Sequence, residues 1–494
     1  MSVPPTISKS SFIRGKQCLK SLYLHINNPG LKDKISEAQQ HVFNIGHETG
    51  RLAQDLFPGG IDASRGKPQE VKEAVAYTQK LIASGQEVIY EAAFGNGETL
   101  CYMDLLVKKD GKWQAFEVKA STAVKNYHLF DVAFQYNVII QSGLPLTEIS
   151  LVHLNNKYVR RGEIDIDQLY TIHNLTGQAK EMQAIVKENL LQMQAMLVSG
   201  QQPDIETGKQ CTQPFTCDFH GYCHRDEKAD LFTGLKGVKA KKIERFRLAG
   251  TTCFEQVPID MKLSTKEQTV LRGLFENKSQ RDDDNIQQFL GKLEYPLHFL
   301  DFETIMFPVP PYDESRPYQQ LPFQYSLHKQ KSPKGRVFHH AFLGSPPHDP
   351  RPGFIERLLA DTEPEGSIIV YNKSFEWQRL RELARDFPGY AYSLQQLNRR
   401  LVDLMGPFRK QWLYLPMMKG SYSIKKVLPA LVPGVSYSDL EIQEGNAAGL
   451  IYASLSADRD PSSVIKKREN LLAYCEMDTW GMVEILKVLS NGVT

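Results

Sequence analysis

Acidic side chains and a lysine lie in two neighbouring segments that are typical of β-strands, TLCYMDLLV and WQAFEVKA. The Asp110-Gly111 pair between them is a favoured two-residue turn, so the sequence predicts a β-hairpin. Counting back from this turn places Asp104 opposite Glu117, and side-chain alternation puts Lys119 on the same face. A divalent cation would remove the repulsion between such acids, and the lysine would stabilise a developing oxyanion or position water. A solvated sheet face with mixed charges is the alternative.

A further acid, Glu91, lies in the preceding strand-like segment EVIYEAAF. A count across the turn from Gly95 to Glu98 places Glu91 opposite Tyr102, on the face that carries Asp104. All these acids have apolar neighbours, among which an unpaired charge is costly. Their surroundings therefore favour a functional role.

A second group of acids lies in the C-terminal part of the chain. Asp301 and Glu303 are two residues apart in the apolar segment PLHFLDFETI, so both project from one face of a strand. Glu376 follows the apolar segment SIIVYN at the predicted start of a helix, and Tyr474 and Asp478 are four residues apart on one helical face. Aligned carboxylates in apolar segments indicate a bound cation. The alternative is a pair of strand-end acids and an ordinary amphipathic helix.

Three of the seven cysteines are equally spaced in KQCTQPFTCDFHGYCH: Cys211, Cys217 and Cys223. This spacing fits zinc ribbons and fingers poorly, because those sites pair cysteines two to four residues apart. Seven cysteines in so long a chain do not indicate a disulfide framework, so the clustered thiols are candidate metal ligands. Three others are predicted to be core residues: Cys101, Cys253 and Cys475.

The elements that would position these residues form two α/β patterns joined by a helical connector. We expect an α/β multidomain protein with domains at residues 1–226, 227–290 and 291–494. The connector ends in the polar run KSQRDDDN, a predicted exposed linker. It also carries six basic residues between Lys236 and Arg247, in a pattern that resembles a helix-hairpin-helix and would present N–H groups to phosphates. A solvated helix face is the alternative.

Composition bounds the remaining possibilities. The chain has 494 residues, a net charge of +2, 41% hydrophobic and 23% charged residues, which excludes wholesale disorder. Because the net charge is only +2, any surface that binds nucleic acid must be a local basic patch. We find no signal-peptide pattern and no apolar stretch of the roughly 20 residues that cross a bilayer, so we expect a cytoplasmic protein with no membrane partner.

Asp104 followed by Glu117-Val118-Lys119 resembles the signature of the PD-(D/E)XK nucleases, specifically the RecB-like branch. The resemblance implies a restriction-endonuclease-like core in which the two acids bind Mg²⁺ or Mn²⁺ and Lys119 acts in catalysis.

The RecB-like branch has three further motifs near its metal. Its helical histidine is matched by His47 in NIGHETGRLAQDLFP, its upstream acid by Glu91, and its glutamine by Gln135 in DVAFQYNVI. The resemblance implies that His47 and Glu91 are metal ligands and that Gln135 belongs to the catalytic site. The usual tyrosine four residues after the glutamine is absent, since Ile139 stands there.

The iron–sulfur subset of RecB-like nucleases has one cysteine before the nuclease core and three after it. Cys18 matches the first, and Cys211, Cys217 and Cys223 match the others. The resemblance implies a [4Fe–4S] cluster that links the two ends of the domain, with zinc as the competing occupant.

The C-terminal acids resemble those of the DEDD exonucleases of the ribonuclease-H-like fold, in the subgroup with tyrosine in the last motif. The resemblance implies that Asp301, Glu303, Glu376 and Asp478 bind two Mg²⁺ or Mn²⁺ ions and that Tyr474 orients the attacking water. This chain departs from the pattern in one respect: the family normally has aspartate where Glu376 stands.

The whole chain resembles a bacterial fusion family that joins these parts in this order, with stretches such as RPYQQLPFQYSLH and GSYSIKKVLPALVP. The resemblance implies a nuclease with a PD-(D/E)XK site and a DEDD 3′→5′ exonuclease site. DNA is favoured over RNA because iron–sulfur RecB-like nucleases generally act in DNA repair, CRISPR adaptation or phage defence. Two alternatives stay open: a non-catalytic nucleic-acid binding module, and an RNA exonuclease that uses only the C-terminal site.

Overall fold

The computed structural model describes residues 5–64, 71–227 and 229–491. It is a mixed α/β protein with several sheets, which confirms the expected α/β class. Within those residues, no helix combines the length and apolarity that crossing a membrane requires.

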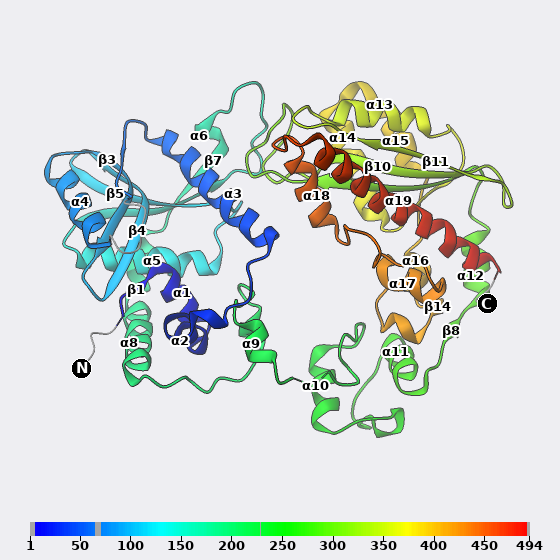
Figure 1. Cartoon of the computed structure of the whole chain (residues 1–494), viewed down its shortest axis with the longest axis horizontal. Coiled ribbons are helices and arrows are strands. Elements are labelled where there is room, and N and C mark those ends of the chain that lie inside the picture. Colours follow the sequence, from blue (N-terminus) through cyan, green and yellow to red (C-terminus); the bar gives the residue numbers. More distant parts are fainter. Residues whose placement is uncertain (1–4, 65–70, 228, 492–494) are drawn as a thin grey trace. The chain divides into compact units, whose positions relative to one another are not determined.

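The chain divides into two compact units (Figure 1). Unit 1 comprises Met1–Glu227 and Phe307–Gln319, and unit 2 comprises Lys228–Met306 and Gln320–Thr494. The main segment of unit 1 ends at Glu227, and residues 227–290 were predicted to form a separate connector. The predicted connector is not a unit of its own, because its residues cluster with unit 2.

Unit 1 is built on a seven-stranded mixed sheet with the order β2-β3-β4-β5-β6-β7, and β1 pairs with β4. The strands β3, β4 and β5 are antiparallel neighbours, and β5 and β6 are parallel. The strands are β1 (Ile7–Ser8), β2 (Ile61–Asp62), β3 (Val88–Gly95), β4 (Thr99–Lys109), β5 (Lys112–Lys119), β6 (Leu146–Leu154) and β7 (Tyr170–Asn174). The helices are α1 (Lys9–Gln17), α2 (Leu19–Asn27), α3 (Glu37–Ala53), α4 (Val71–Ala83), α5 (Asn126–Gln141), α6 (Ile166–Leu169), α7 (Thr176–Glu181), α8 (Gln183–Ser199) and α9 (His220–His224).

The predicted hairpin between β4 and β5 is confirmed. Asp110 and Gly111 both have positive φ, 49° and 74°, as a type I′ turn requires. Lys109 pairs with Lys112, and the ladder continues to the pair beside Asp104 and Glu117.

The predicted register between β3 and β4 is wrong by two residues. The side chain of Asn96 accepts hydrogen bonds from two backbone N–H groups of the turn, so the turn is longer than predicted. The neighbouring pairs of the ladder place Glu91 opposite Asp104 instead of Tyr102. A shift of two residues keeps side chains on the same face, so Glu91 still shares the face of Asp104.

The segment Phe307–Gln319 belongs to unit 1, although it joins two strands of unit 2. Its residues Val309 and Tyr318 pack against the apolar cluster of unit 1. The Tyr318 hydroxyl donates a hydrogen bond to the carbonyl of Ala120, and Arg160 donates to the carbonyls of the Pro310-Pro311 pair. We call this segment the inserted loop.

Unit 2 is built on a five-stranded sheet with the order β11-β10-β9-β12-β13. β10 is antiparallel to both β9 and β11, whereas β12 is parallel to β9 and to β13. The strands of unit 2 are β8 (Gln280–Arg281), β9 (Leu297–Ile305), β10 (Leu321–Gln330), β11 (Val337–Leu343), β12 (Ile368–Val370), β13 (Leu401–Asp403) and β14 (Leu413–Tyr414). Its helices are α10 (Ala240–Leu248), α11 (Thr265–Glu276), α12 (Asp283–Leu290), α13 (Arg351–Asp361), α14 (Lys373–Asp386), α15 (Ala391–Arg399), α16 (Gly406–Arg409), α17 (Ile424–Leu431), α18 (Gly445–Ser454) and α19 (Pro461–Asn491).

The two faces of this sheet differ in chemistry. Apolar residues of β9 and β10, such as Leu300 and Tyr325, pack against α13, α14 and α15. Alternation turns Asp301 and its pairing partner Ser326 to the opposite face, which α19 covers (Figure 1). Asp301 and Ser326 therefore lie on the face of the sheet that α19 covers.

The run KSQRDDDN, predicted to be an exposed linker, is instead ordered secondary structure. It contains β8, which pairs with β14, and the start of α12. The Asp282 side chain accepts a hydrogen bond from the Asn285 N–H at 3.1 Å and so caps that helix.

Candidate metal centres

The first centre is formed by acids and cations around Glu117 on β5. The Glu117 side chain is 1% exposed and accepts hydrogen bonds from three donors. Lys9 and Lys119 approach one carboxylate oxygen at 2.8 and 2.5 Å, and Gln135 on α5 approaches the other at 2.8 Å. The structure thus brings together the predicted lysine, glutamine and glutamate.

Two further predicted acids lie close to Glu117. Asp104 on β4 accepts a hydrogen bond from the Val118 N–H at 2.6 Å, and burial together with the charge of Glu117 raises its pKa well above the usual value. Burial also raises the pKa of Glu91. Burial alone would also raise the pKa of Glu117, but the positive charges of Lys119 and Lys9 outweigh this effect and lower the pKa. In the metal-free protein, Glu117 therefore ionises more readily than Asp104 and Glu91.

The predicted ligand His47 lies exposed on α3, and its charge lowers the pKa of Glu91. In the part of the chain that the structure describes, the ligand atoms of the first centre form no group of three within 4.8 Å. The lysines hold the place at Glu117 that a cation would take. Two buried acceptor oxygens, Oδ1 of Asp131 and Oε1 of Gln135, have no hydrogen-bond partner and fit a cation.

Sequence reasoning missed Lys9 and Asp131. Asp131 forms an ion pair with Lys119 at 2.5 Å, and it precedes Gln135 by four residues, so helical spacing could have found it. Lys9 begins α1, 108 positions before Glu117, and no local pattern indicates this contact. A cavity of about 660 Å³ opens beside Lys119.

The four predicted cluster ligands, Cys18, Cys211, Cys217 and Cys223, line one pocket. Cys18 lies between α1 and α2, and an ion pair from Arg14 to Asp218 ties this end of the chain to the cysteine loop. In the described chain, no three of the four sulfurs lie within 4.8 Å of one another. Four thiols that line one pocket could hold either a [4Fe–4S] cluster or a zinc ion.

The second centre gathers carboxylates from three elements of unit 2. Asp301 and Glu303 lie on β9, Glu376 lies in the first turn of α14, and Tyr474 and Asp478 lie on α19, as predicted. Apart from the part-exposed Asp301, these side chains are buried.

Burial and mutual repulsion act together on these acids. Burial, followed by the charge of Asp478, raises the pKa of Glu303 to about 8, and burial raises that of Glu376 to about 8. Burial raises the pKa of Asp478 to about 6, and burial with the neighbouring acids raises that of Asp301 well above its usual value. The oxygen Oε2 of Glu376 is buried without a hydrogen-bond partner. An orphaned oxygen among acids that resist ionisation fits a divalent cation.

The metal-free protein should lose stability as the pH rises from about 5 to about 8. Unfolded carboxyl groups ionise near pH 4, whereas Glu303 and Glu376 keep their protons up to about pH 8 in the folded state. Between these values the folded state binds more protons, so increasing pH favours unfolding. The melting temperature in EDTA should fall over this range, and Mn²⁺ should restore it. In Glu303→Gln the fall should be smaller; an equal fall in this variant contradicts the assignment.

Three further residues complete the second centre without having been predicted. The Tyr437 hydroxyl donates to Oδ1 of Asp478 at 2.6 Å, and the Lys425 ammonium lies 5.3 Å from the ring centre of Tyr474. Cys475, correctly predicted to be buried, places its sulfur 3.6 Å from Asp301. Lys425 and Tyr437 have no spacing that ties them to the acidic motifs, whereas Cys475 directly follows Tyr474.

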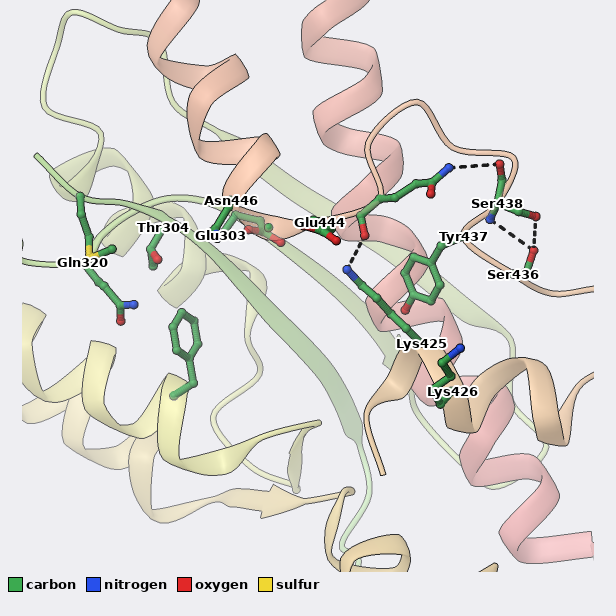
Figure 2. Close-up of a pocket in the computed structure, with 14 residues that line it drawn as sticks. Glu303, Thr304, Gln320, Lys425, Lys426, Ser436, Tyr437, Ser438, Glu444 and Asn446 are labelled. Atoms are coloured by element: carbon green, nitrogen blue, oxygen red, sulfur yellow. Dashed lines mark hydrogen bonds between the residues drawn. The ribbon is translucent and has the colours of Figure 1, made fainter. Parts of the chain in front are cut away.

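A cavity of about 780 Å³ opens beside the second centre. Figure 2 shows Lys425 and Tyr437 side by side on its wall, with Glu303 on the strand behind. Asp403, at the end of β13, adds to the effect of burial in raising the pKa of Glu376 and pairs with Arg409 at 3.1 Å.

Three of the six cations in the basic run of the predicted connector form ion pairs. Lys242 pairs with Glu267, and other cations of α10 pair with acids in the same way. These ion pairs are consistent with a solvated helix face, the alternative to a phosphate-binding run.

Residues 298–423 match a family described as a domain of unknown function, DUF2779. An uncharacterised protein of Mycoplasma pneumoniae is 30% identical over 222 residues, 41% of this chain and 33% of that protein. An uncharacterised protein of Ureaplasma parvum is 32% identical over 142 residues, 24% of this chain and 20% of its own length. The chain thus spans a third or less of these curated relatives, and its similarity to them assigns no activity.

Proposed function

We propose that this protein is a metal-dependent nuclease that hydrolyses phosphodiester bonds of DNA at two centres, one in each unit. The observation that carries the proposal is the convergence of Asp301, Glu303, Glu376 and Asp478 beside an open cavity. Carboxylates that lie this close together repel one another unless protons or cations neutralise their charge. Oxygen ligands of this kind suit Mg²⁺ and Mn²⁺.

The topology of unit 2 supports a ribonuclease-H-like fold. An antiparallel β11-β10-β9 half continues into parallel β12 and β13, and the acids lie on central β9, on α14 and on α19. Two Mg²⁺ or Mn²⁺ ions held there would stabilise the attacking and leaving oxygens of an in-line displacement.

The protein's own groups would orient the reactants at the second centre. Burial and Asp478 raise the pKa of Tyr474 far above the usual value, so its hydroxyl positions the attacking water without acting as a base. Tyr437 fixes the Asp478 carboxylate by its hydrogen bond. Lys425, on the cavity wall, offers a cation to a phosphate.

The first centre supports a PD-(D/E)XK site in unit 1. Asp104 and Glu117 would hold the cation, while Lys119, fixed between Glu117 and Asp131, would stabilise charge that develops on the phosphate. Gln135 orients Glu117 through the hydrogen bond from its amide.

The cavity beside Lys119 supports a single-stranded nucleic-acid substrate. It is lined by the cation Lys125 and by aromatic rings from Tyr127, Phe215 and Tyr318. Cations bind the backbone and exposed rings stack on bases. The preference for DNA rests on the resemblance to iron–sulfur nucleases.

The cysteine pocket would hold a [4Fe–4S] cluster. Protein purified without oxygen should contain about four iron and four sulfide per chain. Cys18→Ser should lose most of this iron, whereas Cys253→Ser, which changes a part-exposed thiol outside the pocket, should keep it. Metal analysis that finds one zinc and no sulfide would identify a zinc site instead.

The proposal is tested by incubating the anaerobically purified protein with Mn²⁺ and end-labelled strands. Single- and double-stranded DNA and RNA, labelled at either end, distinguish the possible substrates. We expect cleavage of DNA by the wild type and none by the double variant Lys119→Ala, Asp301→Asn. Binding without cleavage would indicate a binding module, and cleavage of RNA alone that only Asp301→Asn abolishes would indicate an RNA exonuclease.

A further inference from the structure

Two histidines and a glutamate lie together on unit 2, outside the second centre. His328 on β10 and His339 on β11 are direct partners in the strand ladder, and their rings stack with centres 4.5 Å apart. Glu476 reaches them from α19, with a carboxylate oxygen 3.6 Å from Nδ1 of His339. One ligand atom from each residue lies within 4.8 Å of the other two.

One nitrogen of each imidazole is held by a hydrogen bond to a hydroxyl group, Nδ1 of His328 by Thr479 and Nε2 of His339 by Ser326. The Thr479 hydroxyl lies 3.1 Å from the carbonyl of Glu476, 2.6 Å from the Ser326 hydroxyl and 2.8 Å from Nδ1 of His328. If it donates to the carbonyl, its oxygen accepts from Ser326 and His328. His328 then donates through Nδ1. Ser326 gives its proton to Thr479, so it accepts from Nε2 of His339 at 2.9 Å.

This arrangement leaves one unshared electron pair on each ring, at Nε2 of His328 and Nδ1 of His339. The Glu476 carboxylate thus faces a nitrogen that has no proton to donate. Burial, with the nearby His339, lowers the pKa of His328 to about 3, so this ring is neutral at physiological pH. Neutral imidazoles fixed through their other nitrogen are the form in which histidine binds metals.

We propose that His328, His339 and Glu476 form a site for a transition-metal ion of the Zn²⁺ class. Two imidazoles and one carboxylate suit Zn²⁺ or Co²⁺, whereas Mg²⁺ and Mn²⁺ prefer oxygen ligands. The side chains of His339 and Glu476 are 28% and 48% exposed, so an ion can enter and keep solvent as a further ligand. The bound ion would connect β10, β11 and α19, and α19 also carries Tyr474 and Asp478 of the second centre.

The site uses none of the acids of the second centre, and it does not depend on nuclease activity. His328 pairs across the sheet with Phe299, whereas Asp301 pairs with Ser326. Metal binding is therefore the readout, and the loss of cleavage in any assay would leave the proposal unaffected.

The experiment is a titration of the full chain with Zn²⁺ and with Co²⁺. We expect Zn²⁺ to raise the melting temperature, and Co²⁺ to quench the fluorescence of Trp480, whose ring lies 5.6 Å from that of His328. Both effects should weaken at least about 100-fold in metal concentration for His339→Ala and for Glu476→Gln. The second variant changes an exposed side chain and keeps its shape, so it should fold.

Two controls separate this site from other metal-binding groups. His340→Ala removes the adjacent histidine of β11, which is 30% exposed and faces Asp361, and it should bind as the wild type does. Trp480→Phe should keep the Zn²⁺-induced stabilisation and lose the quenching. Equal Zn²⁺ affinity and stoichiometry in His339→Ala, Glu476→Gln and wild type would overturn the proposal.

Discussion

Asp301→Asn should lower Mn²⁺-dependent exonuclease cleavage by about 10³-fold or more, because the amide no longer supplies the anionic oxygen that holds a cation between attacking and leaving groups. Asp301 places one ligand atom within 4.8 Å of a ligand atom of Glu303 and of the sulfur of Cys475. The measurement is the rate at which labelled 3′ ends shorten at saturating Mn²⁺. An unchanged rate would remove the second centre from the proposal.

The same variant should not destabilise the metal-free protein. Burial and neighbouring acids oppose the ionisation of Asp301, so replacing it with a neutral amide removes an unfavourable charge. Its melting temperature in EDTA at about pH 8 should equal or exceed that of the wild type. The matched control is Asp361→Asn, which alters a buried carboxylate bonded to Tyr325 on the other face of the sheet and should leave cleavage intact.

Lys119→Ala should lower cleavage by the first centre by about 10²- to 10³-fold, the usual effect of removing one group that stabilises transition-state charge. Glu117 keeps its bonds from Lys9 and Gln135, so the local fold should persist. The assay compares single-turnover rates of the Asp301→Asn background with and without the lysine change.

The control for this second effect is Lys125→Ala. Lys125 is an exposed cation that lines the same cavity, but no carboxylate of the first centre holds it. It should weaken substrate binding at low salt and leave the rate at saturation nearly unchanged. If Lys119→Ala and Lys125→Ala lower the cleavage rate at saturation equally, Lys119 acts only as a contact to the phosphate backbone.

Short-range features of the sequence were sufficient to predict the acid positions. The Asp110-Gly111 pair set the β4–β5 hairpin through its turn type, and two-residue spacing put Asp301 and Glu303 on one face of β9. Both depend on periodicities that span a few residues. The β3–β4 register failed because a single side chain, Asn96, decides the turn length.

Contacts that span the chain could not be predicted in this way. Lys9 reaches Glu117 across 108 positions, and Tyr437 reaches Asp478 from a loop outside any repeating pattern. The pairing of His328 with His339 depends on the β10–β11 register, which no motif in the sequence indicates. Such contacts follow from tertiary packing, which single-sequence periodicity does not encode.

The inserted loop has a consequence for how this gene can change by recombination. A single crossover after Glu227 would exchange the first part of the protein but leave Phe307–Gln319 behind with the other parent. Val309 and Tyr318 would then face an apolar cluster that had not diverged alongside them. The segments that encode the two units should therefore be inherited together. Hybrid proteins made from distant relatives should fold only when the inserted loop is exchanged together with unit 1.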